Sequence, residues 1–183
     1  MTVQYFDNLL LVWGTSLALQ IGHRESVDID LFGNIDFDYH AVSELLAKLG
    51  DVTILQQSKN INVLSIDNVK VDFVNYRYPW LNNARIENNL RLASLEDIAA
   101  MKLNAIAGRG TKKDFIDLYF LLQTFTMKEM FDFYAKKFDD GNTFLVQKSL
   151  TYFVDAEKSI MPKMHVDVDW TEVKETIVRQ VSF

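Results

Sequence analysis

The spacing of apolar and polar residues changes along the chain near residue 94. Before this point, short runs predict strands at Val52–Gln56, Ile61–Ile66 and Val69–Asn75, the last two joined by a turn at Asp67–Asn68. After it, apolar residues recur every three to four positions, which predicts helices. The pattern predicts an α/β core over residues 1–93, with a small mixed sheet flanked by helices, and a C-terminal helical region over residues 94–183.

Further elements are predicted from apolar runs and from residues that begin or end helices. Gly22 ends a helix over residues 16–21, and Gly50 closes one over residues 36–49. Ser94 and Asp97 form a capping box that opens a helix over residues 94–107. The remaining predicted elements are helices over residues 5–12, 112–123, 127–137, 143–155 and 171–181, and a strand over residues 91–93.

Two carboxylates stand two residues apart in the run V-D-I-D-L-F. Side chains alternate between the two faces of a strand, so Val27, Ile29 and Leu31 are expected in the core. Asp28 and Asp30 then share the opposite face, where two like charges about 5 to 6 Å apart repel by about 3 kcal/mol at an effective dielectric constant near 20. A divalent cation would offset this repulsion, and a solvated acidic edge strand is the alternative.

The residues just before this strand suit a phosphate group. Gly14 lets the backbone approach closely, and Thr15, Ser16 and the amides that open the following helix can donate hydrogen bonds. Arg24 and Ser26, in the turn into the acidic strand, could contact a triphosphate, and a solvated turn is the other interpretation.

Asp72 is a candidate third carboxylate. It lies in the predicted strand over residues 69–75, on the face opposite Val71 and Phe73. Nucleotidyl transfer by two metal ions needs a third carboxylate on the ion that activates the attacking hydroxyl. Alone, Asp72 would be a surface charge, so its assignment depends on its strand pairing beside the acidic one.

Three charged residues stand within otherwise apolar helical patterns. Lys102 shares an apolar stripe, where its stem could cover apolar surface or its ammonium could reach the phosphates of a nucleotide. Asp114 forms a capping box with Thr111, and Asp117 could pair with Lys113. Both aspartates therefore have structural as well as catalytic explanations.

Composition narrows the class of protein. Of the 183 residues, 49% are hydrophobic and 24% charged, as in a globular protein. The absence of cysteine excludes disulfides, thiolate metal sites and thiol nucleophiles. The net charge of −6 disfavours a long nucleic-acid footprint. With no signal-like segment and no apolar run of about 18 residues, the sequence predicts a cytoplasmic protein without a membrane partner.

Four blocks within residues 10–125 carry a family resemblance. They read G-T-S-L-A-L-Q-I-G-H-R-E-S-V-D-I-D-L-F, V-D-F-V, S-L-E-D-I-A-A-M-K-L-N-A-I and G-R-G-T-K-K-D-F-I-D-L-Y-F-L-L. The first is similar to the signature of the DNA polymerase β-like nucleotidyltransferases, and the set resembles the AbiEii/AbiGii toxin family. Many members carry Gly-Gly where this chain has Trp13 and Gly14, and an indole there could crowd the phosphate site.

The resemblance implies a nucleotidyltransferase fold, with two Mg²⁺ ions held by Asp28 and Asp30 and a nucleoside triphosphate (NTP) as substrate. It implies a part for Lys102, Asp114 and Asp117 in nucleotide binding or catalysis. It also implies a toxin–antitoxin or phage-defence setting, with a separately encoded antitoxin protein as partner.

The sequence thus predicts in-line transfer of a nucleoside monophosphate to an acceptor hydroxyl, with Asp72 completing the metal site and pyrophosphate leaving. An RNA end, a protein hydroxyl and a small molecule all stay open as acceptors. A second hypothesis is a non-catalytic relative that binds a nucleotide or a partner protein, favoured if Asp72 lies apart from the other carboxylates or if Trp13 fills the corner. A third is a structural α/β domain with a solvated acidic strand.

Overall fold

The computed structural model describes residues 6–35 and 39–181, which form two compact units. The first unit comprises residues 1–16, 26–77 and 84–93, and the second comprises residues 17–25, 78–83 and 94–183. The chain passes from one unit to the other at several points, and the last of these lies between Ala93 and Ser94. Two short segments that precede this boundary, residues 17–25 and 78–83, belong to the second unit.

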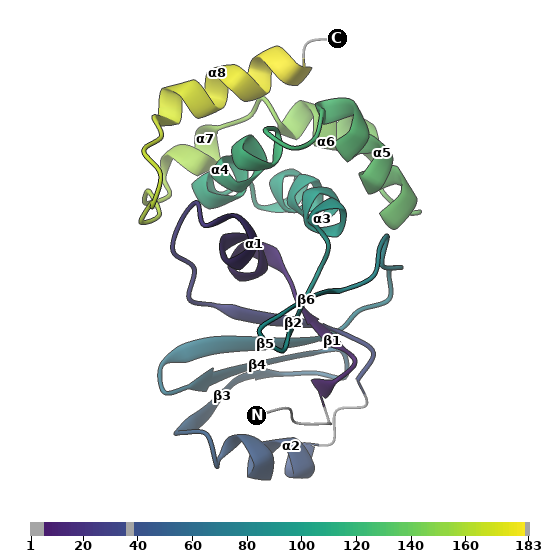
Figure 1. Cartoon of the computed structure of the whole chain (residues 1–183), viewed down its shortest axis with the longest axis vertical. Helices are drawn as coiled ribbons and strands as arrows, with labels where there is room; N and C mark the ends of the chain where they lie inside the picture. The colour runs from purple at the N-terminus through teal and green to yellow at the C-terminus, as the bar shows by residue number, and fades with distance from the viewer. Residues whose placement is uncertain (1–5, 36–38, 182–183) are drawn as a thin grey trace. The chain divides into compact units, whose positions relative to one another are not determined.

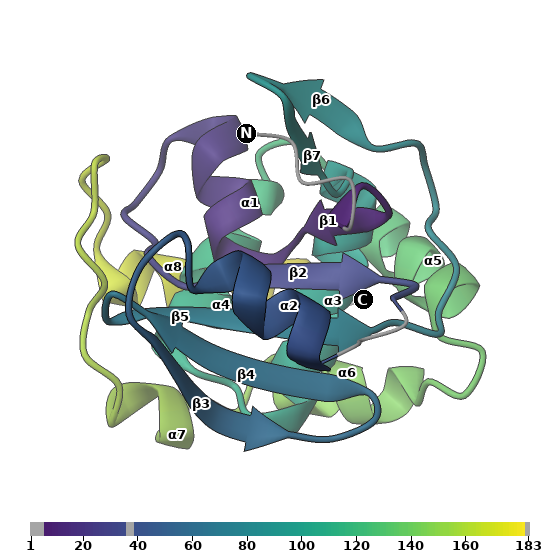
Figure 2. The same ribbon diagram turned by 90° about the horizontal axis from the view of Figure 1, so that it is seen from below.

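A mixed seven-stranded sheet forms the first unit, in the order β3-β4-β5-β2-β1-β7-β6 (Figure 2). The pairs β5–β2 and β1–β7 are parallel and the other neighbours are antiparallel. The mixed sheet confirms the predicted fold class. The strands are β1 (Leu9–Leu11), β2 (Ile29–Gly33), β3 (Val52–Gln57), β4 (Ile61–Ile66), β5 (Val69–Asn75), β6 (Arg85–Glu87) and β7 (Leu90–Leu92).

Two hairpins of the sheet turn on pairs of residues with left-handed backbone. Asp67 and Asn68, with φ of 48° and 67°, join β4 to β5 as predicted. Asn88 and Asn89, with φ of 49° and 63°, join β6 to β7, a hairpin of which only the second strand was predicted. Asn and Asp tolerate this conformation better than other residues with a β-carbon, which suits two-residue hairpin loops.

The predicted helix over residues 5–12 is wrong, because Leu9–Leu11 forms strand β1. This strand lies between β2 and β7, and all three of its residues are buried. A strand covered on both faces reads as an unbroken apolar run, which cannot be told from a buried helix by periodicity.

Helix α2 (Tyr39–Leu46) covers one face of the sheet (Figures 1 and 2). Its Val42 and Leu46 pack in a buried cluster with residues of β4 and β5, including Leu64 and Phe73. Residues 36–38 of the predicted helix lie outside the described part of the chain. Because α2 covers this face, the acidic side chains, which alternate with the core residues, lie on the other one.

Helices form the second unit (Figure 1). Helix α3 packs against α4, α5 and α6, and α4 packs against α7 and α8. The predicted helix over residues 143–155 is instead two helices, since Ser149 and Thr151 hydroxyls donate to backbone carbonyls near the break. The helices are α3 (Leu95–Gly108), α4 (Lys112–Leu121), α5 (Met127–Lys137), α6 (Thr143–Ser149), α7 (Val154–Glu157) and α8 (Trp170–Val181).

A buried ion pair attaches the 78–83 loop to α3 and α5. Lys137 Nζ lies 2.6 Å from Asp97 Oδ1 and donates to Pro79 O at 2.8 Å, and Asp97 accepts from Leu81 N at 3.0 Å. The ammonium also stands 4.4 Å from the centre of the Trp80 ring. The loop is therefore held by hydrogen bonds to two buried charged side chains, Asp97 of α3 and Lys137 of α5, as well as by apolar contacts.

Within the described residues, none of the helices combines the length and apolar character needed to cross a membrane.

Candidate active site

Strands β2 and β5 bring two of the predicted carboxylates together. The two strands are neighbours, which was the condition for the assignment of Asp72; they pair in parallel, and the register places Asp30 directly beside Asp72. Paired residues of neighbouring strands point to the same face of a sheet, so these two carboxylates share the face opposite α2. The hypothesis of a non-catalytic relative therefore loses one of the two observations that would have favoured it, a separation of Asp72 from the acidic strand.

Asp28 lies just before β2 rather than within it, because the strand begins at Ile29. The expectation that Val27 enters the core is wrong, since it is 72% exposed. Ile29 and Leu31 do pack against the core cluster of the first unit, as predicted. The alternation therefore holds from Ile29 onward and stops where the strand ends.

Lys70 lies among the carboxylates on this face. Its Nζ is 2.6 Å from both oxygens of Asp72, and the two side chains are 46% and 18% exposed. Among the described residues, no three acidic or imidazole side chains converge closely enough to hold a metal ion. The donor chemistry nevertheless fits Mg²⁺, because two in-register carboxylates supply hard oxygen ligands and Asp72 already binds a cationic group.

The Gly-Thr-Ser corner is hydrogen-bonded to the acidic strand. Val12 N donates to Asp30 O at 2.9 Å, and the Thr15 hydroxyl donates to Asp28 O. Thr15 Oγ1 also lies 2.8 Å from Ser26 Oγ. The two segments that the sequence assigned to phosphate and metal are thus fastened to each other within the first unit. The Thr15 hydroxyl is used in the hydrogen bond to Asp28, and Ser16 is buried. A ligand at this corner would therefore meet backbone groups rather than these two side chains.

Trp13 opens helix α1 (Trp13–Ile21) with φ of 56°, a left-handed conformation. This costs a residue with a β-carbon about 1 to 2 kcal/mol, whereas glycine adopts it freely. The indole packs edge-on against Phe32, with 6.2 Å between ring centres. The left-handed backbone at position 13 is one that glycine adopts without strain, so glycine suits this position of the corner.

Asp117 is the centre of a buried ionic network in the second unit. It accepts from Arg24 Nε at 2.6 Å and Arg24 Nη2 at 2.8 Å, and its Oδ1 lies 2.7 Å from His23 Nε2. Lys102 Nζ is 2.5 Å from its other oxygen. The sequence predicted that Arg24 contacts the triphosphate. Its guanidinium is instead buried against Asp117, and this contact holds the turn after α1.

Asp114 extends the same network. It lies 3.1 Å from Lys102 Nζ, and it binds Arg109 Nε at 3.0 Å. It also accepts from the Thr111 hydroxyl at 2.6 Å, so the predicted capping box is confirmed. Lys102, Asp114 and Asp117 are each at most 1% exposed, and the lysine joins α3 to both aspartates of α4. The predicted Asp117–Lys113 pair is replaced by these buried partners.

The network lowers the pKa of both aspartates. Burial alone would raise the pKa of Asp117, but the charge of Lys102 and the hydrogen bonds from Arg24 and His23 outweigh it. Burial likewise would raise the pKa of Asp114. The charges of Lys102 and Arg109 outweigh this effect and hold the pKa well below its usual range. Both groups therefore stay ionised in the folded protein at pH values where the unfolded chain takes up protons.

These shifts predict acid sensitivity. A carboxyl with a lowered folded-state pKa stabilises the protein above its unfolded pKa, about 3.9, and the stabilisation is lost as the pH falls toward the folded value. The free energy of unfolding in urea is expected to fall below about pH 4, by up to about 2.7 kcal/mol per pH unit for two such groups. A free energy of unfolding that stays constant below about pH 4 would contradict this prediction.

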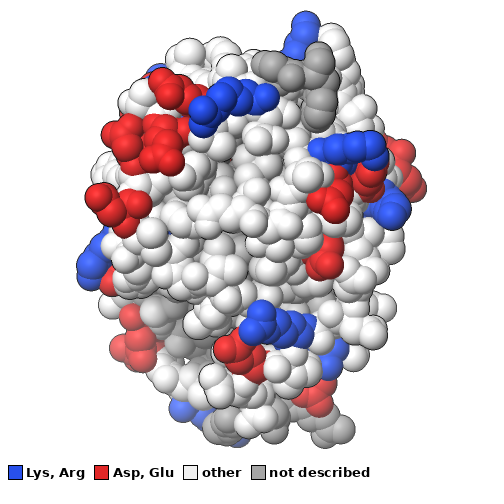
Figure 3. All heavy atoms as spheres, turned by 45° about the horizontal axis from the view of Figure 1, so that its top comes forward, with Lys and Arg blue, Asp and Glu red and all other residues white. Residues whose placement is uncertain are grey.

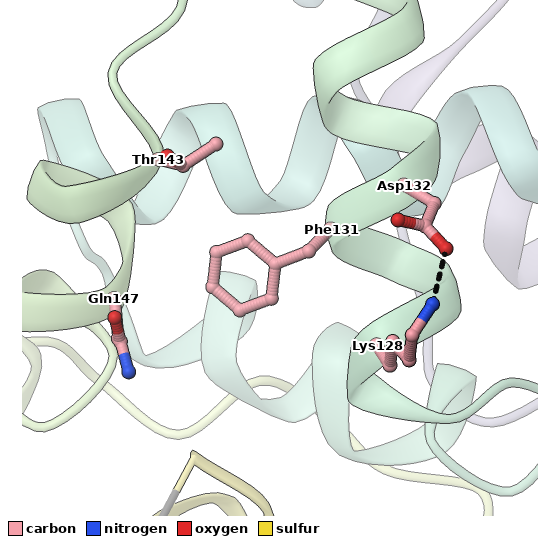
Figure 4. A pocket seen from close by; sticks show the side chains of 5 residues that line it. All are labelled: Lys128, Phe131, Asp132, Thr143 and Gln147. Carbon is pink, nitrogen blue, oxygen red and sulfur yellow. Dashed lines mark hydrogen bonds and ion pairs between the residues drawn. The ribbon is translucent and has the colours of Figure 1, made fainter. Parts of the chain in front are cut away.

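Two surface hollows lie in the second unit. The one between α5 and α6 has a volume of about 310 Å³, and Phe131 points into it between Gln147 and the Lys128–Asp132 pair (Figure 4). It contains none of the predicted site residues. On the face seen in Figure 3, basic and acidic groups alternate around uncharged surface, without a continuous basic tract. Geometry at the acidic strand, rather than cavity size, therefore identifies the candidate site.

Lys70 and His23 were not among the site residues predicted from the sequence. Lys70 had a signal, because it stands two residues before Asp72 and must share its face in a strand. His23 had none, since its partner is 94 positions away in the sequence.

Comparison with known proteins identifies a family and a relative that resemble this chain. A family model described as nucleotidyl transferase AbiEii toxin, type IV TA system, matches residues 1–182. An uncharacterized protein of Aquifex aeolicus (strain VF5), aq_aa25, is 38% identical over 181 residues, covering 96% of this chain and 87% of that protein.

Three solved structures share the fold at low sequence identity. JHP933 from Helicobacter pylori has a TM-score of 0.63 at 17% identity, covering 95% of this chain and 82% of that one. MenT4, the nucleotidyltransferase toxin Rv2826c of Mycobacterium tuberculosis H37Rv, has a TM-score of 0.57 at 14% identity, covering 99% and 77%. ANT(2'')-Ia, in complex with adenylyl-2''-tobramycin, has a TM-score of 0.52 at 14% identity, covering 70% and 85%.

The family match extends over nearly the whole chain. The chain belongs to the AbiEii toxin family of nucleotidyltransferases, of type IV toxin–antitoxin systems.

Proposed function

We propose that this protein transfers a nucleoside monophosphate from an NTP to an acceptor hydroxyl at the acidic face of its sheet. The hydroxyl oxygen forms a bond to the α-phosphorus, the bond from that phosphorus to the β-phosphate oxygen breaks, and pyrophosphate leaves. The hydroxyl proton passes to solvent. The observation that carries the proposal is the register of β2 and β5, which sets Asp30 beside Asp72.

Two Mg²⁺ ions are the cofactor we propose, with Asp28, Asp30 and Asp72 as protein ligands. When bound, the ions would neutralise phosphate charge and lower the pKa of the attacking hydroxyl. The backbone amides of Gly14 and Thr15 at the first turn of α1 would hold the phosphates, because the first amides of a helix have no partner within that helix. The Ser16 amide donates to Val12 O at 3.3 Å, so we propose that Ser16 supports this turn. The connection of Thr15 to the carbonyl of Asp28 supports one shared site for both functions.

For Lys102, Asp114 and Asp117 we propose a structural part in place of contact with the nucleotide. Each is at most 1% exposed, and their charges are matched to one another and to Arg24. A group that contacts a substrate has to be exposed to it. Burial of the whole set favours holding α3, α4 and the turn after α1 in place, and Arg24 joins them in this role.

We propose only the chemical class of the acceptor, which is a hydroxyl group of a macromolecule. The product seen with ANT(2'')-Ia is an adenylylated small molecule, and MenT4 is named a toxin. Toxicity requires modification of something that the cell needs, which favours a macromolecule such as an RNA end or a protein hydroxyl over a drug. An antitoxin protein is the other partner we propose, on the strength of the family.

A thermal shift assay with each NTP, with and without Mg²⁺, tests the nucleotide site. A ligand at 100 times its dissociation constant stabilises the folded state by about 2.7 kcal/mol, which raises the melting temperature by roughly 5 to 11 °C for a chain of this size. We expect such a shift with at least one NTP and Mg²⁺ together. Absence of a shift with every NTP would favour the partner-binding relative instead.

A further inference from the structure

Lys70 is held against Asp72 by more than a chance surface contact. Its Nζ is 2.6 Å from Oδ1 and 2.6 Å from Oδ2, so one ammonium spans both oxygens of the carboxylate. The carboxylate is only 18% exposed, whereas the lysine is 46% exposed. The arrangement is that of a cation placed on a partly buried anionic ligand, with a route to solvent for the cation.

The sheet register places Lys70 among the other carboxylates. Ile29 pairs with Val71 and Asp30 with Asp72, and Asp28 lies just before the first paired residue of β2. Lys70 and Asp72 stand two apart on β5 and share one face. One ammonium thus lies on the same face of the sheet as the paired carboxylates of Asp30 and Asp72.

We propose that Lys70 is a built-in counterion that competes with the divalent metal for Asp72 and thereby sets the metal affinity of the site. This inference rests on the proposed function. For a metal ion to bind Asp72, the ammonium of Lys70 has to leave both carboxylate oxygens. The side chain of Lys70 is 46% exposed, so the ammonium can move into solvent. In the metal-free protein, the ammonium offsets repulsion between Asp30 and Asp72. An isolated surface salt bridge is the ordinary alternative, and it would leave metal affinity unchanged.

Lys70→Met isolates the charge, because it keeps an unbranched apolar stem of similar length. Removing a positive charge a few ångströms from a divalent ion is expected to tighten metal binding by about tenfold or more. Lys70→Arg retains the charge and is expected to bind metal as the wild type does. Lys59→Met, an equal charge change in the exposed turn between β3 and β4, is the matched control.

The experiment is a titration of the intact protein with Mn²⁺, without nucleotide, followed by calorimetry and by loss of the free-ion EPR signal. Tighter binding by Lys70→Met, with Lys70→Arg and Lys59→Met unchanged, supports the proposal. Equal or weaker binding by Lys70→Met, while Asp72→Asn abolishes binding, would overturn it and leave the proposed metal site standing. If neither the wild type nor any variant binds Mn²⁺ at millimolar concentration, the proposed metal site itself fails, and this inference with it.

Discussion

Replacing Asp30 with asparagine is expected to reduce pyrophosphate release from an NTP by at least about 100-fold, the scale seen when a preorganised charge-stabilising group is lost. The substitution removes a proposed metal ligand while keeping the shape of the side chain. It also removes one of two like charges placed beside each other on β2 and β5. The melting temperature of the metal-free protein is therefore expected to stay the same or to rise.

Asp51→Asn is the control for this substitution. Asp51 is an exposed residue of the same unit, just before β3, and its replacement changes the net charge equally. We expect its pyrophosphate release and melting temperature to match the wild type. Equal activity of Asp30→Asn and wild type, or equal loss in both variants, would contradict a site at Asp30.

Replacing Asp117 with alanine is expected to lower the free energy of unfolding by about 3 to 5 kcal/mol, because it leaves the buried guanidinium of Arg24 without its carboxylate and Lys102 with Asp114 alone. Lys102 and Arg24 both contact Asp117 and are nearly inaccessible to water. The measurement is urea unfolding at pH 7, followed by circular dichroism. Restoring charge balance with apolar residues, as in Asp117→Leu combined with Lys102→Met, is expected to recover part of the loss.

Asp132→Ala provides the comparison. Asp132 pairs with Lys128 one turn away on α5, and both side chains are more than half exposed. Exposed pairs of this kind contribute about 0.3 to 0.5 kcal/mol, so the control is expected to unfold almost as the wild type does. Similar losses in Asp117→Ala and Asp132→Ala would show that the buried network does not stabilise the fold in the way its geometry suggests.

The sequence predicted the elements whose signal is local. The strands β3, β4 and β5, the Asp67–Asn68 turn and the caps of α3 and α4 each follow from residues close together in the chain. Alternation also predicted the face on which Asp72 lies, whereas the pairing of its strand with the acidic strand was only a condition, which the structure meets. β1 was missed because burial on both faces removes the alternation that identifies a strand.

Partners far apart in the sequence could not be predicted in this way. Lys102, Asp114 and Asp117 were correctly identified as unusual charges on apolar helices, but His23 and Arg24 join them across more than ninety residues. Neither periodicity nor residue type indicates such a contact. Because these side chains are buried, we propose that they stabilise the packing of the helices rather than contact the nucleotide.

The most direct test of the central claim is the fate of the phosphates of an NTP. The protein is incubated with Mg²⁺, NTP labelled at either the α- or the γ-phosphate, and a cell extract that supplies RNA, protein and small-molecule hydroxyls. Nuclease and protease digestion of the product then identifies the acceptor class. Nucleotidyl transfer at the acidic face predicts that the α-label joins an acceptor, that the γ-label leaves as pyrophosphate, and that Asp30→Asn does neither. Transfer of the γ-label, or no transfer of either label by the wild type, would contradict the account.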